Sequence, residues 1–197
     1  MAELVNQAAV RIKQQQTIAG LKEREALARQ VLAVDPSNPR ARAALAFSLT
    51  NQVINFNSLE LFSPRAMSDA LSQATALTDQ LLLDEPDNVT IWQLKSQLAR
   101  ERLDYPSARA ALERALQIDP RAPRALQLMG ALFSHLGDAE QAREWALKAL
   151  AAPSYLPPVG AYSILSNSAM RSGDYPAAVE WAQKGVEASP DNPGFRA

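Results

Sequence analysis

Apolar residues recur every three or four positions along most of the chain, in segments that end at prolines. The stretch Val89–Ala122 shows this pattern most completely. Asp104 stands at an N-cap position between two apolar stripes, and Pro106 follows in a first helical turn, where no backbone donor is lost. Pro120 ends the second stripe. The helical spacing predicts an antiparallel helix pair with these apolar residues inside: Trp92, Leu94, Leu98 and Ala99, then Ala108, Leu112, Ala115, Leu116 and Ile118.

The same arrangement returns twice along the following residues. Pro123–Ser154 and the segment from Val159 to Pro190 again place small or apolar residues at matching positions, with a turn at Gly137-Asp138 and at Gly173-Asp174. A helix pair repeating about every 34 residues, closed by Ala-Leu-x-Ile-Asp-Pro in its first copy, resembles the tetratricopeptide repeat (TPR). The resemblance implies an all-α fold, a right-handed solenoid of about five TPR-like helix pairs with a concave groove lined by the first helix of each pair.

The residues before Val89 fit this scheme less regularly. An amphipathic helix is predicted over Leu4–Gln16 and a second over about Leu21–Val34, which together form a degenerate first repeat at residues 1–36. The second unit, 37–86, exceeds the usual period, so its two helices and the loop Asn57–Ser63 are predicted to be lengthened. Regular repeats follow at 87–120, 121–154 and 157–190, and residues 1–197 are interpreted as a single solenoid.

Composition excludes several kinds of function. The net charge of −1 gives no broad field toward nucleic acid, and no apolar run is long enough for membrane insertion. The absence of cysteine fits cytoplasm or periplasm. MAELVNQAAV lacks the features of a secretory signal, which favours the cytoplasm unless a signal sequence was removed.

Motifs for catalysis or cofactor binding are missing from the sequence. His135 is the single histidine, so neither a nucleophile–base pair nor a zinc site of the usual composition can be assembled. There is no glycine-rich phosphate loop and no metalloprotease motif. We therefore expect no enzyme, no cofactor and no metal. The three tryptophans, Trp92, Trp145 and Trp181, are interpreted as packing residues rather than as a ligand cage.

The TPR resemblance implies which side chains face the groove. Amides there can hydrogen-bond an extended peptide, and arginines can pair with carboxylates, which favours a protein or peptide partner, acidic in character. Lysines and asparagines that clamp C-terminal carboxylates in some members are absent from the corresponding places. The expected groove residues are Arg40, Phe47, Asn51, Gln93, Gln97, Arg100, Arg124, Gln127, His135, Asn167 and Arg171.

Three functional hypotheses follow. The first is a protein–protein interaction scaffold that binds a peptide or partner protein in the groove. The second is a regulatory or sensor module of a larger protein, because Leu21–Pro120 is similar to TPR segments of bacterial signalling and transcription regulators; a free-standing assembly factor, similar to TPR proteins of pilus or cytochrome biogenesis, competes with it. The third is self-association through the C-terminal edge, where Val179, Trp181 and Val186 lack a following helix.

Overall fold

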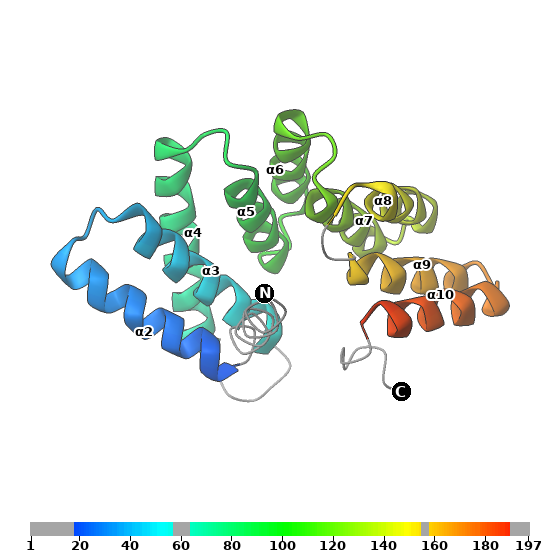
Figure 1. Cartoon of the computed structure of the whole chain (residues 1–197), viewed down its shortest axis with the longest axis horizontal. Coiled ribbons are helices and arrows are strands. Elements are labelled where there is room, and N and C mark those ends of the chain that lie inside the picture. Colours follow the sequence, from blue (N-terminus) through cyan, green and yellow to red (C-terminus); the bar gives the residue numbers. More distant parts are fainter. Residues whose placement is uncertain (1–17, 57–63, 155–157, 190–197) are drawn as a thin grey trace, which may run out of the picture. The chain divides into compact units, whose positions relative to one another are not determined.

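A computed structural model describes residues 18–56, 64–154 and 158–189. These residues form nine α-helices and no strand, and they belong to two compact units, residues 1–86 and 87–197 (Figure 1). The predicted all-α fold is confirmed. The predicted helix Leu4–Gln16, the loop Asn57–Ser63 and the last residues, 190–197, lie outside the described residues.

The N-terminal unit contains three helices, α2 (Ile18–Val34), α3 (Pro39–Phe56) and α4 (Pro64–Asp84). Helix α3 packs against both α2 and α4. The predicted lengthening of the two helices is confirmed, because α3 has 18 residues and α4 has 21, whereas the helices after residue 88 have 13 or 14. The core of this unit is made of buried aliphatic side chains: Leu21, Leu45, Leu49, Val53 and Leu81.

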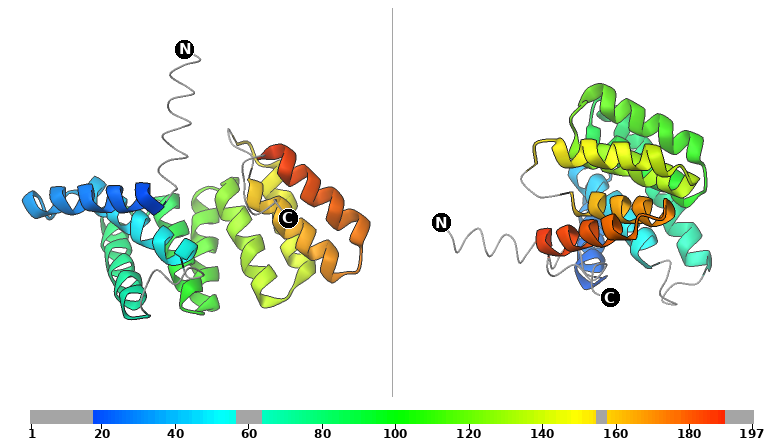
Figure 2. Two further views of the ribbon diagram at one scale, coloured as in Figure 1. Left: turned by 90° about the horizontal axis from the view of Figure 1, so that it is seen from below. Right: turned by 90° about the vertical axis from the view of Figure 1, so that its right-hand side faces the viewer.

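Three antiparallel helix pairs build the C-terminal unit (Figures 1 and 2). They are α5 (Val89–Glu101) with α6 (Tyr105–Ile118), α7 (Pro123–Leu136) with α8 (Ala139–Ala151), and α9 (Val159–Arg171) with α10 (Tyr175–Ala188). We call the first helix of each pair the A helix and the second the B helix. Each A helix also contacts the next A helix, and α6 and α8 pack against the A helix that follows them.

Small residues allow these helices to approach closely. Ala108, Ala142 and Ala178 occupy equivalent places on the three B helices and are all buried. One such contact is at Gly130 of α7, where an added Cβ would lie 3.1 Å from the backbone oxygen of Ala142 and 3.3 Å from the backbone nitrogen of Ala146. Trp145 packs against the buried clusters on both sides of α7, which confirms its predicted packing role.

The turns from the A helix to the B helix have the same backbone hydrogen bond in all three pairs. The backbone N–H groups of Asp104, Asp138 and Asp174 donate to carbonyls five residues earlier, at 2.9–3.0 Å, and the three carboxylates cap the B helices. The residue before each aspartate has a left-handed backbone, with φ of 83° at Gly137 and 78° at Gly173. Leu103 holds the same position in the first pair, with φ of 59°.

Candidate functional site

The A helices of the C-terminal unit carry eight of the eleven predicted groove residues. We call these eight, together with Glu101, the A face: Gln93, Gln97, Arg100, Glu101, Arg124, Gln127, His135, Asn167 and Arg171. The remaining three, Arg40, Phe47 and Asn51, belong to α3 of the N-terminal unit. The A face is therefore the larger candidate site within one compact unit.

The side chains of Arg124 and Gln97 join α7 to α5. The Arg124 guanidinium donates to Gln97 Oε1 at 3.4 Å, and the Gln97 amide donates to the backbone carbonyl of Gln93 at 3.3 Å. Burial lowers the pKa of Arg124, and the neighbouring positive charge of Arg100 lowers it further. Arg124 is nevertheless exposed to solvent, and its guanidinium remains protonated at neutral pH. Two positive charges are thus held close together on this face.

Gln127 joins α7 to α9 on the same face. Its amide occupies the space that a Cβ of Gly160 would fill, so glycine at that position lets the glutamine lie directly on the backbone of α9. Nothing in the sequence pattern singled out Gly160. Its spacing of 33 residues from Gln127 is close to the repeat length, which is the signal that places the two residues on adjacent A helices.

A second group of charges lies where the A helices end. Arg100 donates to Glu101 at 3.0 Å, and both side chains are largely buried. The pKa of His135 is lowered by partial burial and by the positive charges of Arg100 and Arg171, while Glu101 opposes this shift. Arg171 also reaches toward Gly137 at the end of α7. Residues from α5, α7 and α9 therefore share one electrostatic environment, although Glu101 was not among the expected groove residues.

Charge is distributed differently on the two kinds of helix. The A helices carry Lys95, Arg100, Arg124 and Arg171 but a single acidic residue, Glu101. On the B helices the numbers of acidic and basic residues are equal. Several basic side chains there are paired with acids: Arg109 with Glu113, Arg114 with Asp87, Lys148 with Glu144 and Lys184 with Glu180.

Two arginines of the A face have no such partner. In the part of the chain that the structure describes, neither Arg124 nor Arg171 forms an ion pair within 4.0 Å. Both can therefore present donors to an incoming carboxylate without first breaking a salt bridge. The described residues contain no group of three or more side chains able to hold a metal ion, and none of their helices is long and apolar enough to cross a membrane.

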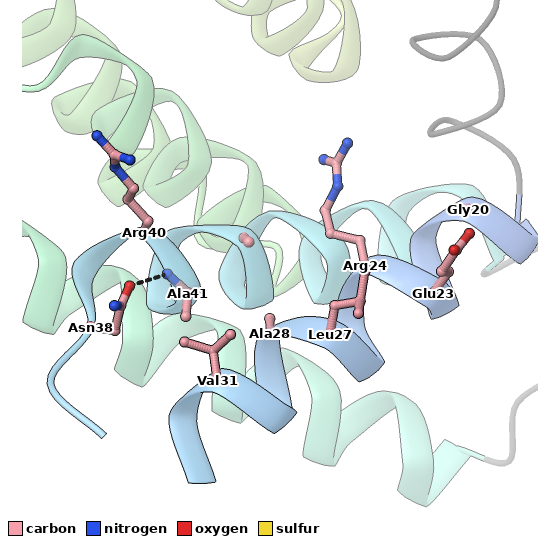
Figure 3. Close-up of a pocket in the computed structure, with 10 residues that line it drawn as sticks. Gly20, Glu23, Arg24, Leu27, Ala28, Val31, Asn38, Arg40 and Ala41 are labelled. Atoms are coloured by element: carbon pink, nitrogen blue, oxygen red, sulfur yellow. Dashed lines mark hydrogen bonds between the residues drawn. The ribbon is translucent and has the colours of Figure 1, made fainter. Parts of the chain in front are cut away.

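The three predicted residues on α3 have separate surroundings. The guanidinium of Arg24, on α2, lies 5.0 Å from the centroid of the Phe47 ring. Asn51 donates to the Phe47 carbonyl at 2.8 Å, so its amide is engaged by its own helix. Arg40 borders a cavity of about 610 Å³ between α2 and α3, with Val31 and Ala41 on its apolar side (Figure 3).

Comparison with known proteins assigns the family. Residues 68–123 and 94–157 match the model of the tetratricopeptide repeat, and the helix pairs described above have that architecture. Residues 68–157 contain tetratricopeptide repeats. This TPR protein is 36% identical over 103 residues to small glutamine-rich tetratricopeptide repeat-containing protein 2 of Mycosarcoma maydis. The match covers 51% of the chain and 28% of the relative, so the chain spans little more than a quarter of that protein.

Solved structures share the fold at low sequence identity. TTC0263, a thermophilic TPR protein of Thermus thermophilus, has a TM-score of 0.70 at 17% identity, covering 90% of this chain and 88% of the other. MamA has a TM-score of 0.58 at 16% identity over 90% and 93% of the chains. PilW, a type IV pilus biogenesis factor, has 0.61 at 20% identity over 77% and 65%. These similarities establish the TPR solenoid as the fold.

Proposed function

We propose that this TPR protein is an interaction scaffold whose A face binds an acidic, extended segment of a partner protein. The family supports the first half of the proposal, because TPR proteins are generally non-enzymatic scaffolds that bind proteins or peptides. The claim that the A face binds an acidic segment goes beyond the family and rests on the charges of that face. A regulatory module of a larger signalling protein would use the same face, so the experiment below applies to it equally.

The main observation in favour of an acidic partner is the excess of basic over acidic residues on the A helices. Charge-assisted hydrogen bonds contribute about 1.5–3 kcal/mol each, roughly twice the value for neutral pairs. Arg124 and Arg171 have no ion-pair partner among the described residues, whereas Arg100 is already paired with Glu101. The first two therefore provide most of the attraction for a carboxylate. Exposed groups on the same face, such as Asn167, add hydrogen-bonding capacity for a peptide backbone.

Defined peptides test this proposal without knowledge of the native partner. The probe is a fluorescently labelled peptide of alternating glutamate and serine, compared with a glutamine–serine peptide of the same length by fluorescence anisotropy. We expect the acidic peptide to bind, and its affinity to fall as salt is raised, because the Debye length shrinks below about 8–10 Å. Replacing both Arg124 and Arg171 by glutamine should weaken binding by about 1–3 kcal/mol, roughly 5- to 150-fold.

The matched control removes the same charge from the B helices. Arg109→Gln combined with Arg143→Gln lowers the net charge equally but leaves the A face intact. This control should bind the acidic peptide within about twofold of the unaltered protein, since exposed charges at a distance are screened. Equal losses in both double variants would mean that only the net charge matters, and unchanged binding in the Arg124/Arg171 variant would exclude the A face.

Self-association is a second candidate, and α10 carries the observation in its favour. Val179 and Val186 are exposed on this helix, and their places correspond to Arg143 and Leu150 of α8, where Leu150 packs against the cluster shared with α9. Burying these residues between two copies would remove apolar surface from water. Sedimentation equilibrium of the full chain and of a Val179→Glu, Val186→Glu variant tests this. A monomer at all concentrations in the unaltered protein would rule it out.

A further inference from the structure

The cavity that Arg40 borders is an open, partly apolar groove of the N-terminal unit. It is lined by residues between positions 20 and 31 of α2 and between positions 38 and 44 of α3, and we call it the α2–α3 groove (Figure 3). Leu27 and Val31 both line it, and they are 56% and 45% exposed. Being four residues apart, they lie on one stripe of α2. A helix that covered this stripe would remove apolar surface from water.

The residues directly before α2 have the length to fill this groove. An amphipathic helix is predicted over Leu4–Gln16, and α2 begins at Ile18, next to the end of the groove that Gly20 lines. At 1.5 Å per residue the predicted helix is about 20 Å long, and residues 20–31 of α2 extend over roughly 17 Å. A turn near Thr17 would therefore lead this helix back along the whole groove, antiparallel to α2.

The apolar positions of the two helices meet in this arrangement. Positions at equal distances from a turn near Thr17 lie opposite each other, because both helices rise by the same amount per residue. Ala8 is then opposite Leu27, and Leu4 is opposite Val31. Ala8 and Leu4 belong to the apolar stripe of the predicted helix, and the small alanine leaves room for the leucine. The stripe of the segment and the stripe of the groove therefore have the same spacing.

The groove has charges of different sign at its two ends. Glu23 and Arg24 lie toward the beginning of α2, and Arg40 lies at the opposite end (Figure 3). The Arg24 guanidinium already lies against an aromatic ring of α3. Among the described residues, neither Glu23 nor Arg40 forms an ion pair within 4.0 Å. Asp35, in the turn after α2, accepts a hydrogen bond from Ser37 at 2.7 Å. Glu23 and Arg40 are thus the two groove charges open to a new partner.

The N-terminal segment carries the complementary charges in the matching order. Glu3 stands just before the predicted helix, and Arg11 stands near its end. An antiparallel helix in the groove brings Glu3 toward Arg40 and Arg11 toward Glu23, so opposite charges meet at both ends. Length, apolar spacing and charge order therefore favour the same occupant in the same direction.

We propose that residues 4–16 bind in the α2–α3 groove as an amphipathic helix antiparallel to α2, with Glu3 paired to Arg40. The groove is then an internal docking site whose occupant belongs to the same chain. Arg40 was one of the expected partner-binding residues, and this contact gives it an intramolecular role instead. Recognition of a partner protein is left to the A face of the C-terminal unit.

Hydrogen exchange of the full chain, followed by nuclear magnetic resonance, tests the apolar contact. The amides of residues 8–16 should exchange slowly in the unaltered protein, and their protection should fall at least about tenfold in a Leu27→Glu, Val31→Glu variant. Val34→Glu combined with Leu83→Glu is the matched control. These two residues are 89% and 84% exposed, and they belong to the same unit but do not line the groove. The control should keep the protection.

Charge reversal tests the direction of the helix with substitutions that leave the core untouched. Glu3→Arg and Arg40→Glu should each lower the protection of residues 8–16 by about two- to fivefold, and the double variant should restore most of it. Glu3→Arg with Arg143→Glu, on α8, has the same net charge as the double variant and should restore none.

Three results would overturn the proposal. The first is rapid exchange of residues 8–16 in the unaltered protein. The second is slow exchange that is indifferent to both the Leu27/Val31 and the Glu3/Arg40 substitutions, because the helix would then lie elsewhere. The third is protection that disappears on dilution, which would assign the groove to the segment of a second copy.

Discussion

Replacing Gly130 by alanine tests the close packing of α7 on α8. Alanine in a helix interior is favoured over glycine by about 1 kcal/mol, so propensity alone predicts stabilisation. The added Cβ, however, would lie 3.1 Å and 3.3 Å from backbone atoms of α8 and 3.5 Å from Ile164 Cδ1. Backbone atoms of a packed helix cannot move aside alone, and overpacking costs about 1–3 kcal/mol. We therefore expect a net destabilisation of up to about 2 kcal/mol, the packing cost less the propensity gain.

Urea denaturation followed by circular dichroism measures this effect, and Gly160→Ala is the matched control. At Gly160 the obstructing group is the amide end of the flexible Gln127 side chain, which can rotate away. The control should therefore be neutral or up to about 1 kcal/mol more stable. With an m-value of about 2 kcal/mol/M, the Gly130 variant should unfold at up to about 1 M less urea. Stabilisation of both variants to the same extent would show that α7 and α8 are farther apart than described.

Three further predictions concern the core, the charged cluster and the first repeat. Ala108→Leu or Ala142→Leu should lower the free energy of unfolding by about 1–3 kcal/mol, measured by urea denaturation, because both alanines are buried at helix contacts; unchanged midpoints would refute this packing. Nuclear magnetic resonance titration should give His135 a pKa below its ordinary 6.5, raised by Arg171→Gln and lowered further by Glu101→Gln, and opposite shifts would contradict the described cluster. Because the folded pKa is depressed, the contribution of His135 to stability is present above pH 6.5 and is lost as the pH falls through the folded pKa. If residues 4–16 pair with α2, then Val5→Cys with Val31→Cys should form an intramolecular disulfide in this cysteine-free chain, whereas Gln7→Cys with Val31→Cys should not; equal cross-linking of the two pairs would argue against a fixed helix there.

Helix boundaries were the part of the fold most accessible from the sequence. Pro39 and Pro64 are the first residues of α3 and α4, because proline fixes a helical φ and needs no donor in the first turn. Asp104, Asp138 and Asp174 indicated the turns of the C-terminal unit, because an N-cap aspartate accepts a hydrogen bond from a backbone N–H of the first helical turn. The predicted helix start near Leu21 was wrong, because Gly20 lies within α2, which is helical from the first described residue, Ile18.

Side-chain partners were less accessible than helix boundaries. The repeat period placed Gln97 and Arg124 on adjacent A helices, but it could not show that Gln97 donates to its own helix at Gln93 and accepts from Arg124. Rotamer choice decides such contacts, and it depends on neighbours from other helices. The left-handed backbone at Leu103 could have been predicted from the sequence, because this leucine aligns with Gly137 and Gly173 of the next two repeats.

The unequal distribution of charge between A and B helices also bears on how fast a partner arrives. A surface on which positive charge gathers attracts an acidic segment before contact and orients it toward that side, which raises association rates above the usual value of about 10⁵–10⁶ M⁻¹s⁻¹. The paired charges of the B helices largely cancel one another and exert little pull from a distance. Encounters would therefore be productive from one direction, and the association rate constant would respond to ionic strength more steeply than the dissociation rate constant.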